Sequence, residues 1–190
     1  MPRQIDTDKL FETTVAVFAE RGYQAATTQE IARRSGVNEV TLFRRFGGKA
    51  ALIDAALTHT LARSPFARLT VTDDLTTDLV ALVEAFTETV RRHGDATLVL
   101  LTEIPRHPEL REATSALMPN QQAAARVIQA HQDRGELIEG EPMRMLNSLI
   151  APLMVAALWQ RTGNTPLGPE DTPEAIVGTF LNGHRADDGR

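Results

Sequence analysis

The fold of this chain is decided by residues 27–52, which read TTQEIARRSGVNEVTLFRRFGGKAAL. Thr27 and Glu30 have the spacing of a capping box, in which the hydroxyl accepts from the N3 amide and the carboxylate accepts from the cap amide. We therefore expect a short helix that starts at Thr27 and ends near Gly36, where glycine permits a sharp turn. A second short helix should follow, because Asn38 is a favourable N-cap. Two short helices joined by a tight glycine turn form the helix-turn-helix signature.

The second of these helices has one side for packing and one side for solvent. Ala32 is small where the two helices must approach closely. Val37, Leu42 and Phe46 can lock the second helix onto the first. The residues left with outward-facing options are Glu39, Val40, Thr41, Arg44 and Arg45. Such an exposed helix face can enter the major groove of DNA, and the alternative is an ordinary three-helix bundle with no DNA partner.

The rest of the chain also predicts helices. Residues 6–21 carry an apolar stripe at helical spacing and end at Gly22, and residues 49–62 form a fourth helix. No stretch shows sustained period-two alternation, so we expect an all-α fold. The predicted helices of the body, with one short piece, are 73–93, 95–104, 108–118, 119–134, 142–161 and 172–182. The predicted domains are a three-helix, helix-turn-helix head at 1–48 and a larger helical body at 49–190.

Composition narrows the class of protein. The 190 residues are 42 % apolar, which is enough for a buried core. There is no cysteine, no apolar run of eighteen residues and no apolar N-terminal stretch, so we expect a cytoplasmic protein without a membrane span or secretion signal. Residues 1–63 hold nine Lys and Arg against seven Asp and Glu, whereas residues 64–190 hold eleven against eighteen. A slightly basic head on an acidic body suits a head that touches a polyanion, although chance scatter of charge is an equal alternative.

The pattern TTxxIAxxSGVxxxTLFxxFxxKxxL over residues 27–52 resembles the DNA-binding domain of the TetR (tetracycline-repressor-like) family. The resemblance covers about residues 8–55. It implies that Thr28 contacts a phosphate and that Gln29 reaches a base edge. Thr41 and Arg44 match recognition-helix positions that face bases, and Arg44 suits a bidentate contact with guanine. Lys49 matches the phosphate-binding lysine of the family.

Two positions depart from the family pattern. Phe43 stands where the family commonly has Tyr, so a phosphate hydrogen bond is lost. Arg45 stands where His is common, and its permanent charge can offset that loss. Glu39 could accept a hydrogen bond from a cytosine amino group, or it could be only a favourable charge near a helix N-terminus.

The resemblance also implies that the body dimerises and binds a small molecule. The predicted dimer surface is a stripe on the helices at 142–161 and 172–182, formed by Leu146, Leu149, Ile150, Leu153, Ala157, Ile176 and Phe180. The alternative for this stripe is an intramolecular core. A mostly apolar effector pocket would be lined by Phe66, Phe86, Leu101, Met118, Met154 and Trp159, for which plain core is again the alternative. The expected function is a homodimeric repressor that a small effector releases from palindromic operator DNA.

Enzymatic chemistry has little support in the sequence. The five histidines show no metal-ligand spacing, and we expect surface or capping roles for them. Gly47-Gly48-Lys49 lacks the other residues of a phosphate-binding loop, so we expect no catalytic residue, no metal and no cofactor. A helical protein-interaction module without DNA binding and an all-helical enzyme remain as alternative functions.

Overall fold

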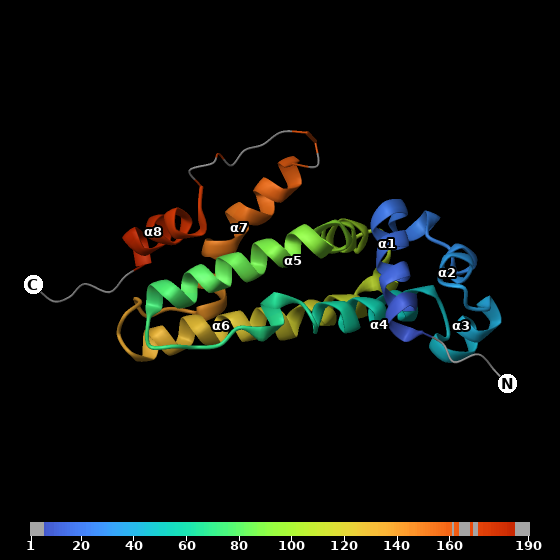
Figure 1. Cartoon of the computed structure of the whole chain (residues 1–190), viewed down its shortest axis with the longest axis horizontal. Helices are drawn as coiled ribbons and strands as arrows, with labels where there is room; N and C mark the ends of the chain where they lie inside the picture. The colour runs from blue at the N-terminus through green and yellow to red at the C-terminus, as the bar shows by residue number, and fades with distance from the viewer. Residues whose placement is uncertain (1–5, 161, 164–167, 169–170, 185–190) are drawn as a thin grey trace, which may run out of the picture. The chain divides into compact units, whose positions relative to one another are not determined.

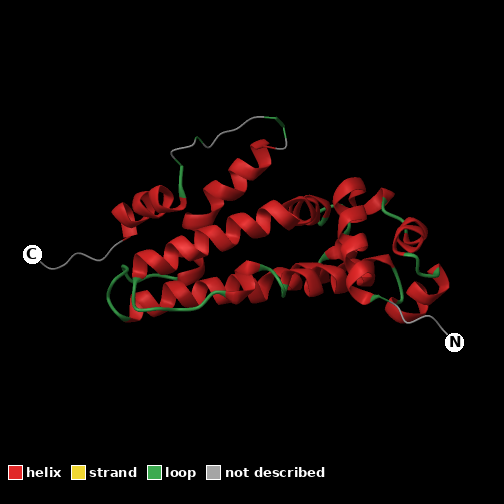
Figure 2. Ribbon diagram, viewed as in Figure 1, coloured by secondary structure: helices red, strands yellow, loops and turns green. Residues whose placement is uncertain are grey.

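A computed structural model of the chain describes residues 6–160, 162–163, 168 and 171–184. Within these residues the structure is helical with no β-strand, as Figure 2 shows. The α-helices are α1 (Thr7–Ala25), α2 (Thr28–Ser35), α3 (Glu39–Phe46), α4 (Lys49–Leu61), α5 (Leu75–Glu103), α6 (Met118–Asp133), α7 (Pro142–Gln160) and α8 (Pro173–His184). Three short 3-10 helices are η1 (Pro65–Arg68), η2 (Pro108–Leu110) and η3 (Glu112–Leu117). The predicted all-α fold is confirmed.

The chain forms two compact units that do not follow the order of the sequence. Unit 1 contains Met1–Arg63 and His93–Pro119, and unit 2 contains Ser64–Arg92 and Asn120–Arg190. Unit 1 therefore joins the helix-turn-helix, labelled α2 and α3 in Figure 1, to the end of α5 and to η2 and η3. The predicted boundary between residues 48 and 49 lies inside unit 1, because α4 packs along α1.

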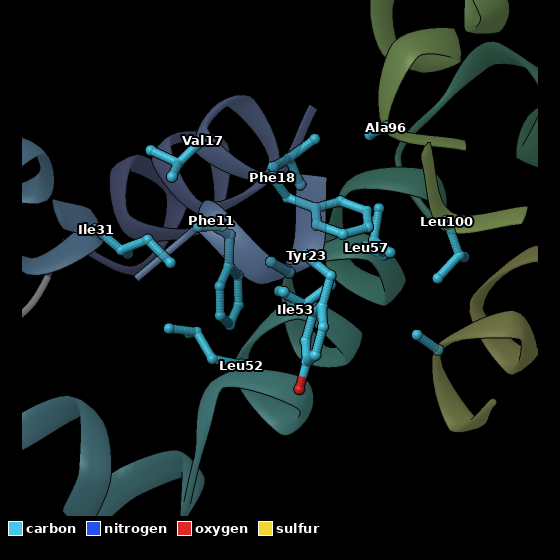
Figure 3. Close-up of a cluster of buried hydrophobic side chains, with 14 of the residues drawn as sticks. Phe11, Val17, Phe18, Tyr23, Ile31, Leu52, Ile53, Leu57, Ala96 and Leu100 are labelled. Carbon is cyan, nitrogen blue, oxygen red and sulfur yellow. The ribbon is translucent and has the colours of Figure 1, made fainter. Parts of the chain in front are cut away.

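The core of unit 1 is built mainly from the apolar faces of α1, α2 and α4, with further buried side chains from α3, α5, η2 and η3. Figure 3 shows Phe18 of α1, Ile31 of α2 and Leu57 of α4 among its buried side chains, and each is at most 1 % exposed. Burying a side chain of this size stabilises the folded state by roughly 1.5–3 kcal/mol. This shared core holds the short helices α2 and α3, which are too short to be stable on their own.

Glycine breaks α1 near its end, as the sequence predicts. Gly22 has φ 69° and ψ 177°, and the helical segment continues only to Ala25. A φ in this range favours glycine because a Cβ would crowd the backbone. The break redirects the chain, and the next residue, Tyr23, is buried in the core of unit 1 at 8 % exposure.

Helix α5 differs from the prediction. We expected one helix over 73–93 and another over 95–104, separated at Gly94, but the structure has a single helix of 29 residues, Leu75–Glu103. A glycine inside a helix costs about 1 kcal/mol relative to alanine. The neighbouring Ala96 and Leu100 are at most 1 % exposed, and this burial outweighs that cost.

Helix α7 is strongly apolar. By length and composition it could cross a membrane: over eighteen residues its mean hydropathy is 1.2, and 33 % of that stretch is buried. It contains no uninterrupted apolar run of eighteen residues, in agreement with the sequence analysis, and most of its few polar side chains are uncharged. One side of α7 lies in the core of unit 2, which is the environment of an ordinary core helix.

His131 is an exception to the expectation that the histidines lie on the surface or cap helices. It is fully buried in unit 2, with Nε2 2.8 Å from an Asp78 carboxylate oxygen and Nδ1 2.6 Å from a Glu136 carboxylate oxygen. Thr72 also donates to Asp78, through its amide and its hydroxyl. A buried polar group must find partners, and this network ties α5 to α6 and to the loop after α6.

Candidate nucleic-acid interface

The turn between α2 and α3 has the geometry of a helix-turn-helix. Thr27 caps α2 by accepting from the Glu30 amide at 3.1 Å, and Asn38 caps α3 by accepting from the Val40 amide at 2.8 Å. Between the two helices, Gly36 takes the left-handed conformation at φ 74°. Leu42 is 2 % exposed, and it anchors α3 to the core of unit 1. Local capping and one buried leucine therefore fix the orientation of α3.

The remaining faces of α3 are open to solvent. Val40 is 74 % exposed and Phe43 is 50 % exposed, and Arg44 and Arg45 are exposed as well. No carboxylate of the described residues forms an ion pair with either arginine. Arg45 has its guanidinium carbon 5.4 Å from the centre of the Phe46 ring. Helix α3 thus presents apolar and unneutralised basic side chains outward.

The arginines of α2 are paired instead. The Glu30 carboxylate accepts from Arg33 at 2.8 Å and from Arg34 at 2.7 Å, and Arg34 also pairs with Glu20 at 2.7 Å. These side-chain hydrogen bonds lower the pKa of Glu30 to about 2. The predicted hydrogen bond from the Thr27 amide to the Glu30 carboxylate is therefore wrong, because the carboxylate accepts from Arg33 and Arg34 instead.

Thr28 and Glu39 join the starts of α2 and α3. The Thr28 hydroxyl donates to a Glu39 carboxylate oxygen at 2.6 Å, and both side chains are partly buried. In this arrangement the Thr28 hydroxyl proton is engaged, so a phosphate oxygen would have to compete with Glu39 for it. Gln29 beside them is exposed, and Thr41 on α3 is partly buried.

Lys49 opens α4 but does not extend into solvent. Its ammonium donates to the carbonyl oxygen of Tyr23 and, at 3.5 Å, to that of Gln24. It also lies 4.0 Å from the centre of the Tyr23 ring. Burial lowers the pKa of Lys49, while the Glu109 carboxylate acts in the opposite direction.

The environment of Lys49 contains residues that the sequence analysis did not single out. Tyr23 packs against Lys49 and against the ring of His107 from the segment after α5, and the nearby Glu109 carboxylate raises the pKa of Tyr23. The sequence predicts a helix end at Gly22, directly before Tyr23, but a helix end does not indicate which residues the next side chain will contact. Nothing in the local sequence connects Tyr23 to residues more than eighty positions later.

The six side chains predicted to line an effector pocket do not share one environment. Phe66 and Phe86 meet edge to face in the core of unit 2, with ring centroids 5.5 Å apart, and Met154 packs against the same core. The other three are about half exposed: Leu101, Met118 and Trp159. The first two of these belong to unit 1. Phe66, Phe86 and Met154 therefore belong to one apolar core, and a pocket shared by all six side chains stays a prediction.

The stripe predicted as a dimer surface lies mostly inside the single chain. Five of its seven side chains are at most 7 % exposed: Leu146, Leu149, Ile150, Leu153 and Phe180. Ala157 and Ile176 are partly buried. The five buried side chains pack in the core of unit 2, which agrees with the alternative of an intramolecular core. The exposed apolar side of α7 is formed instead by Val155, Leu158 and Trp159, at 52 %, 48 % and 53 % exposure.

Metal ligands are not grouped in the described part of the chain, where no three His, Asp or Glu side chains could hold an ion together.

Two family models match the chain. Residues 10–56 match the model for bacterial regulatory proteins of the tetR family. Residues 69–179 match the tetracyclin repressor-like C-terminal domain. The second match alone spans more than half of the chain.

Several curated proteins are similar to this chain. An uncharacterized HTH-type transcriptional regulator of Mycobacterium tuberculosis (strain ATCC 25618 / H37Rv) is 27 % identical over 138 residues, which are 72 % of this chain and 66 % of that protein. The uncharacterized HTH-type regulator YerO of Bacillus subtilis (strain 168) is 29 % identical over 112 residues, which are 55 % and 39 %. The chain thus spans less than two thirds of the length of these relatives.

Solved structures share the fold at low sequence identity. The fatty acid degradation regulator FadR from Bacillus halodurans has a TM-score of 0.76 at 16 % identity, covering 93 % of this chain and 98 % of that one. A TetR family transcriptional regulator from Pseudomonas syringae pv. tomato str. DC3000 has a TM-score of 0.73 at 20 % identity, covering 96 % and 98 %. At these identities the likeness concerns the fold alone.

Proposed function

Because this chain belongs to the tetR family of bacterial regulatory proteins, we propose that it is a DNA-binding transcriptional regulator that acts as a repressor in the cytoplasm. The observation that carries the proposal is the outward face of α3, where Arg44 and Arg45 have no ion-pair partner among the described residues. An exposed helix with unneutralised cations suits a major groove lined by phosphates. We expect no enzymatic activity.

The contacts divide into those that read bases and those that position the protein. Arg44 would donate to guanine, with Thr41 and Gln29 at neighbouring base edges. Val40 and Phe43 offer apolar surface for a thymine methyl group. Phosphate contacts would come from three side chains: Thr28, Arg45 and Lys49.

Glu39 has a positioning role in this proposal. Its carboxylate accepts the Thr28 hydroxyl, so it orients the starts of both helices. A cytosine amino group would donate to the carboxylate lone pairs that this hydroxyl leaves open. Phosphate binding by Thr28 can use the backbone amides at the start of α2, which helix geometry leaves without partners.

Dimerisation would use the outward faces of α7 and α8 rather than the predicted stripe. Val155, Leu158 and Trp159 form an exposed apolar side of α7, and the exposed Ala175 and Gly178 of α8 allow close approach. Two helices from each copy would form a four-helix interface. A two-fold pair presents two recognition helices, and a spacing of about 34–36 Å matches successive major grooves.

An effector would bind in the helical body, which the sequence analysis places at residues 49–190. The aromatic and methionine side chains of the core of unit 2 favour a small, mostly apolar molecule. A coupling free energy of about 1–3 kcal/mol would change DNA affinity 5- to 150-fold. An effector that binds the body and leaves operator affinity unchanged would contradict this part of the proposal.

Selection of bound sequences from random duplex DNA tests the function directly. We expect enrichment of a palindrome whose half-sites are centred about 10–10.5 base pairs, or a multiple of that, apart. Affinity for the selected site should fall steeply as salt rises, because several phosphates are neutralised. Failure to enrich any duplex sequence at low salt would overturn the proposal.

A further inference from the structure

The ammonium of Lys49 is held by a cluster that reaches beyond the helix-turn-helix. Its first partners are the carbonyl oxygens at the end of α1 and the face of the Tyr23 ring, 4.0 Å away. Cations near helix C-terminal carbonyls and over aromatic faces are both stabilised electrostatically. A phosphate oxygen would have to compete with these partners for the ammonium.

Tyr23 is itself held from the other side. Figure 3 shows its ring within the buried cluster, with the hydroxyl directed away from the apolar side chains. Burial raises the pKa of Tyr23, and the nearby Glu109 carboxylate raises it further. The ring of His107 lies 4.7 Å from the Tyr23 ring. Segment 107–109 therefore clamps the tyrosine against which Lys49 rests.

The clamp is completed by a second carboxylate. His107 Nδ1 lies 3.6 Å from Glu109, and its Nε2 lies 3.5 Å from Glu103 at the end of α5. All five residues belong to unit 1, so the cluster lies within one compact unit. It connects the first residue of α4 with the segment between α5 and η3.

We propose that Tyr23 and Glu109 are positioning residues that hold Lys49 away from DNA, so that segment 107–109 sets how readily this lysine reaches a phosphate. The proposal rests on the proposed DNA contact of Lys49. Glu109 places a negative charge near the ammonium, and it lies 3.6 Å from His107, whose ring packs against the Tyr23 ring beneath Lys49. Weakening this hold leaves the ammonium freer to exchange the Tyr23 carbonyl for a phosphate oxygen.

A double-mutant cycle on DNA affinity tests the coupling. Glu109→Gln should tighten binding to nonspecific duplex DNA about two- to tenfold, and this gain should disappear in a Lys49→Gln background. The matched control is Glu112→Gln, which removes the same charge three residues later on an exposed side chain. A gain from Glu109→Gln that equals the control, or that persists without Lys49, would overturn the proposal.

Chemical labelling of Lys49 in the absence of DNA separates this inference from the proposed function. The rate of reductive methylation of Lys49, followed by peptide mass spectrometry, should rise in Glu109→Gln but not in Glu112→Gln. Equal labelling in all variants, with unchanged thermal unfolding, would contradict the clamp even if the protein binds DNA. Faster labelling in a protein that fails to bind DNA would support the clamp and reject the function.

Discussion

Helices α2 and α3 share one plan and differ in their electrostatics. Each has eight residues, a side-chain cap at its start and a left-handed glycine at its end. Each also carries two consecutive arginines in its last turn. In α2 the arginines meet Glu30 and Glu20, whereas those of α3 meet no carboxylate of the described residues. Whether a pair of arginines can bind an anion such as a phosphate therefore depends on whether nearby carboxylates already neutralise it.

The largest expected effect concerns how α3 is anchored. Leu42→Ala should lower the free energy of unfolding by about 2–5 kcal/mol, because it leaves a cavity beneath the helix. Val40→Ala, on the exposed side of the same helix, should change it by less than about 0.5 kcal/mol. Urea unfolding followed by circular dichroism measures both. Similar losses of unfolding free energy for the two variants would mean that Leu42 does not anchor α3 to the core.

The comparison of the two arginine pairs predicts the next effect. Arg44→Ala should weaken binding to the selected DNA site by about 1–3 kcal/mol and relax the preference at one base pair. Arg33→Ala should cost much less, because its guanidinium is engaged by Glu30 and is mostly exposed. Fluorescence anisotropy with site variants checks both. Equal losses would break the distinction between α2 and α3.

The smallest expected effect on DNA affinity comes from freeing the arginines of α2 from their carboxylate, so that they resemble those of α3. Glu30→Gln removes the carboxylate shared by Arg33 and Arg34, and nonspecific DNA should then bind more tightly, by less than about tenfold. Since the folded pKa of Glu30 is about 2, below its ordinary value of 4.5, its stabilisation is present above pH 4.5 and is lost as pH falls toward 2. The variant should lack this acid-dependent loss in unfolding measurements.

Glu88 supplies the control for that experiment. Its carboxylate accepts from Arg91 and Arg92 in α5, and these hydrogen bonds lower its pKa to about 2 as well. Glu88→Gln should remove a similar acid-dependent stabilisation while leaving DNA affinity unchanged. If both variants bind DNA equally more tightly, the gain reflects net charge and not the arginines of α2.

The helix-turn-helix could be predicted closely because its determinants are local. Caps, glycine turns and the apolar spacing around Leu42 act over three or four residues, and the structure places Thr27, Asn38 and Gly36 in the predicted roles. The helix boundaries of the body are less predictable from local sequence. Gly94 predicts a helix end, but the burial of side chains on both sides of it keeps α5 continuous.

Local sequence patterns also do not predict which distant side chains come into contact in the folded chain. Tyr23 packs against His107, and His131 lies within hydrogen-bond distance of Asp78, although each pair is more than fifty residues apart in sequence. On α7, where apolar residues occupy several sides, the sequence alone did not decide which side packs inside. The predicted stripe entered the core, and the side bearing Val155 stayed exposed.

By itself, the sequence determined that this protein is helical, where its short N-terminal helices begin and end, and which family it resembles. Only the tertiary structure decided which arginines are neutralised, which face of α7 is free and where Lys49 rests. The physical reason is range: caps and turns depend on hydrogen bonds between near neighbours, whereas burial and ion pairing depend on residues that folding brings together.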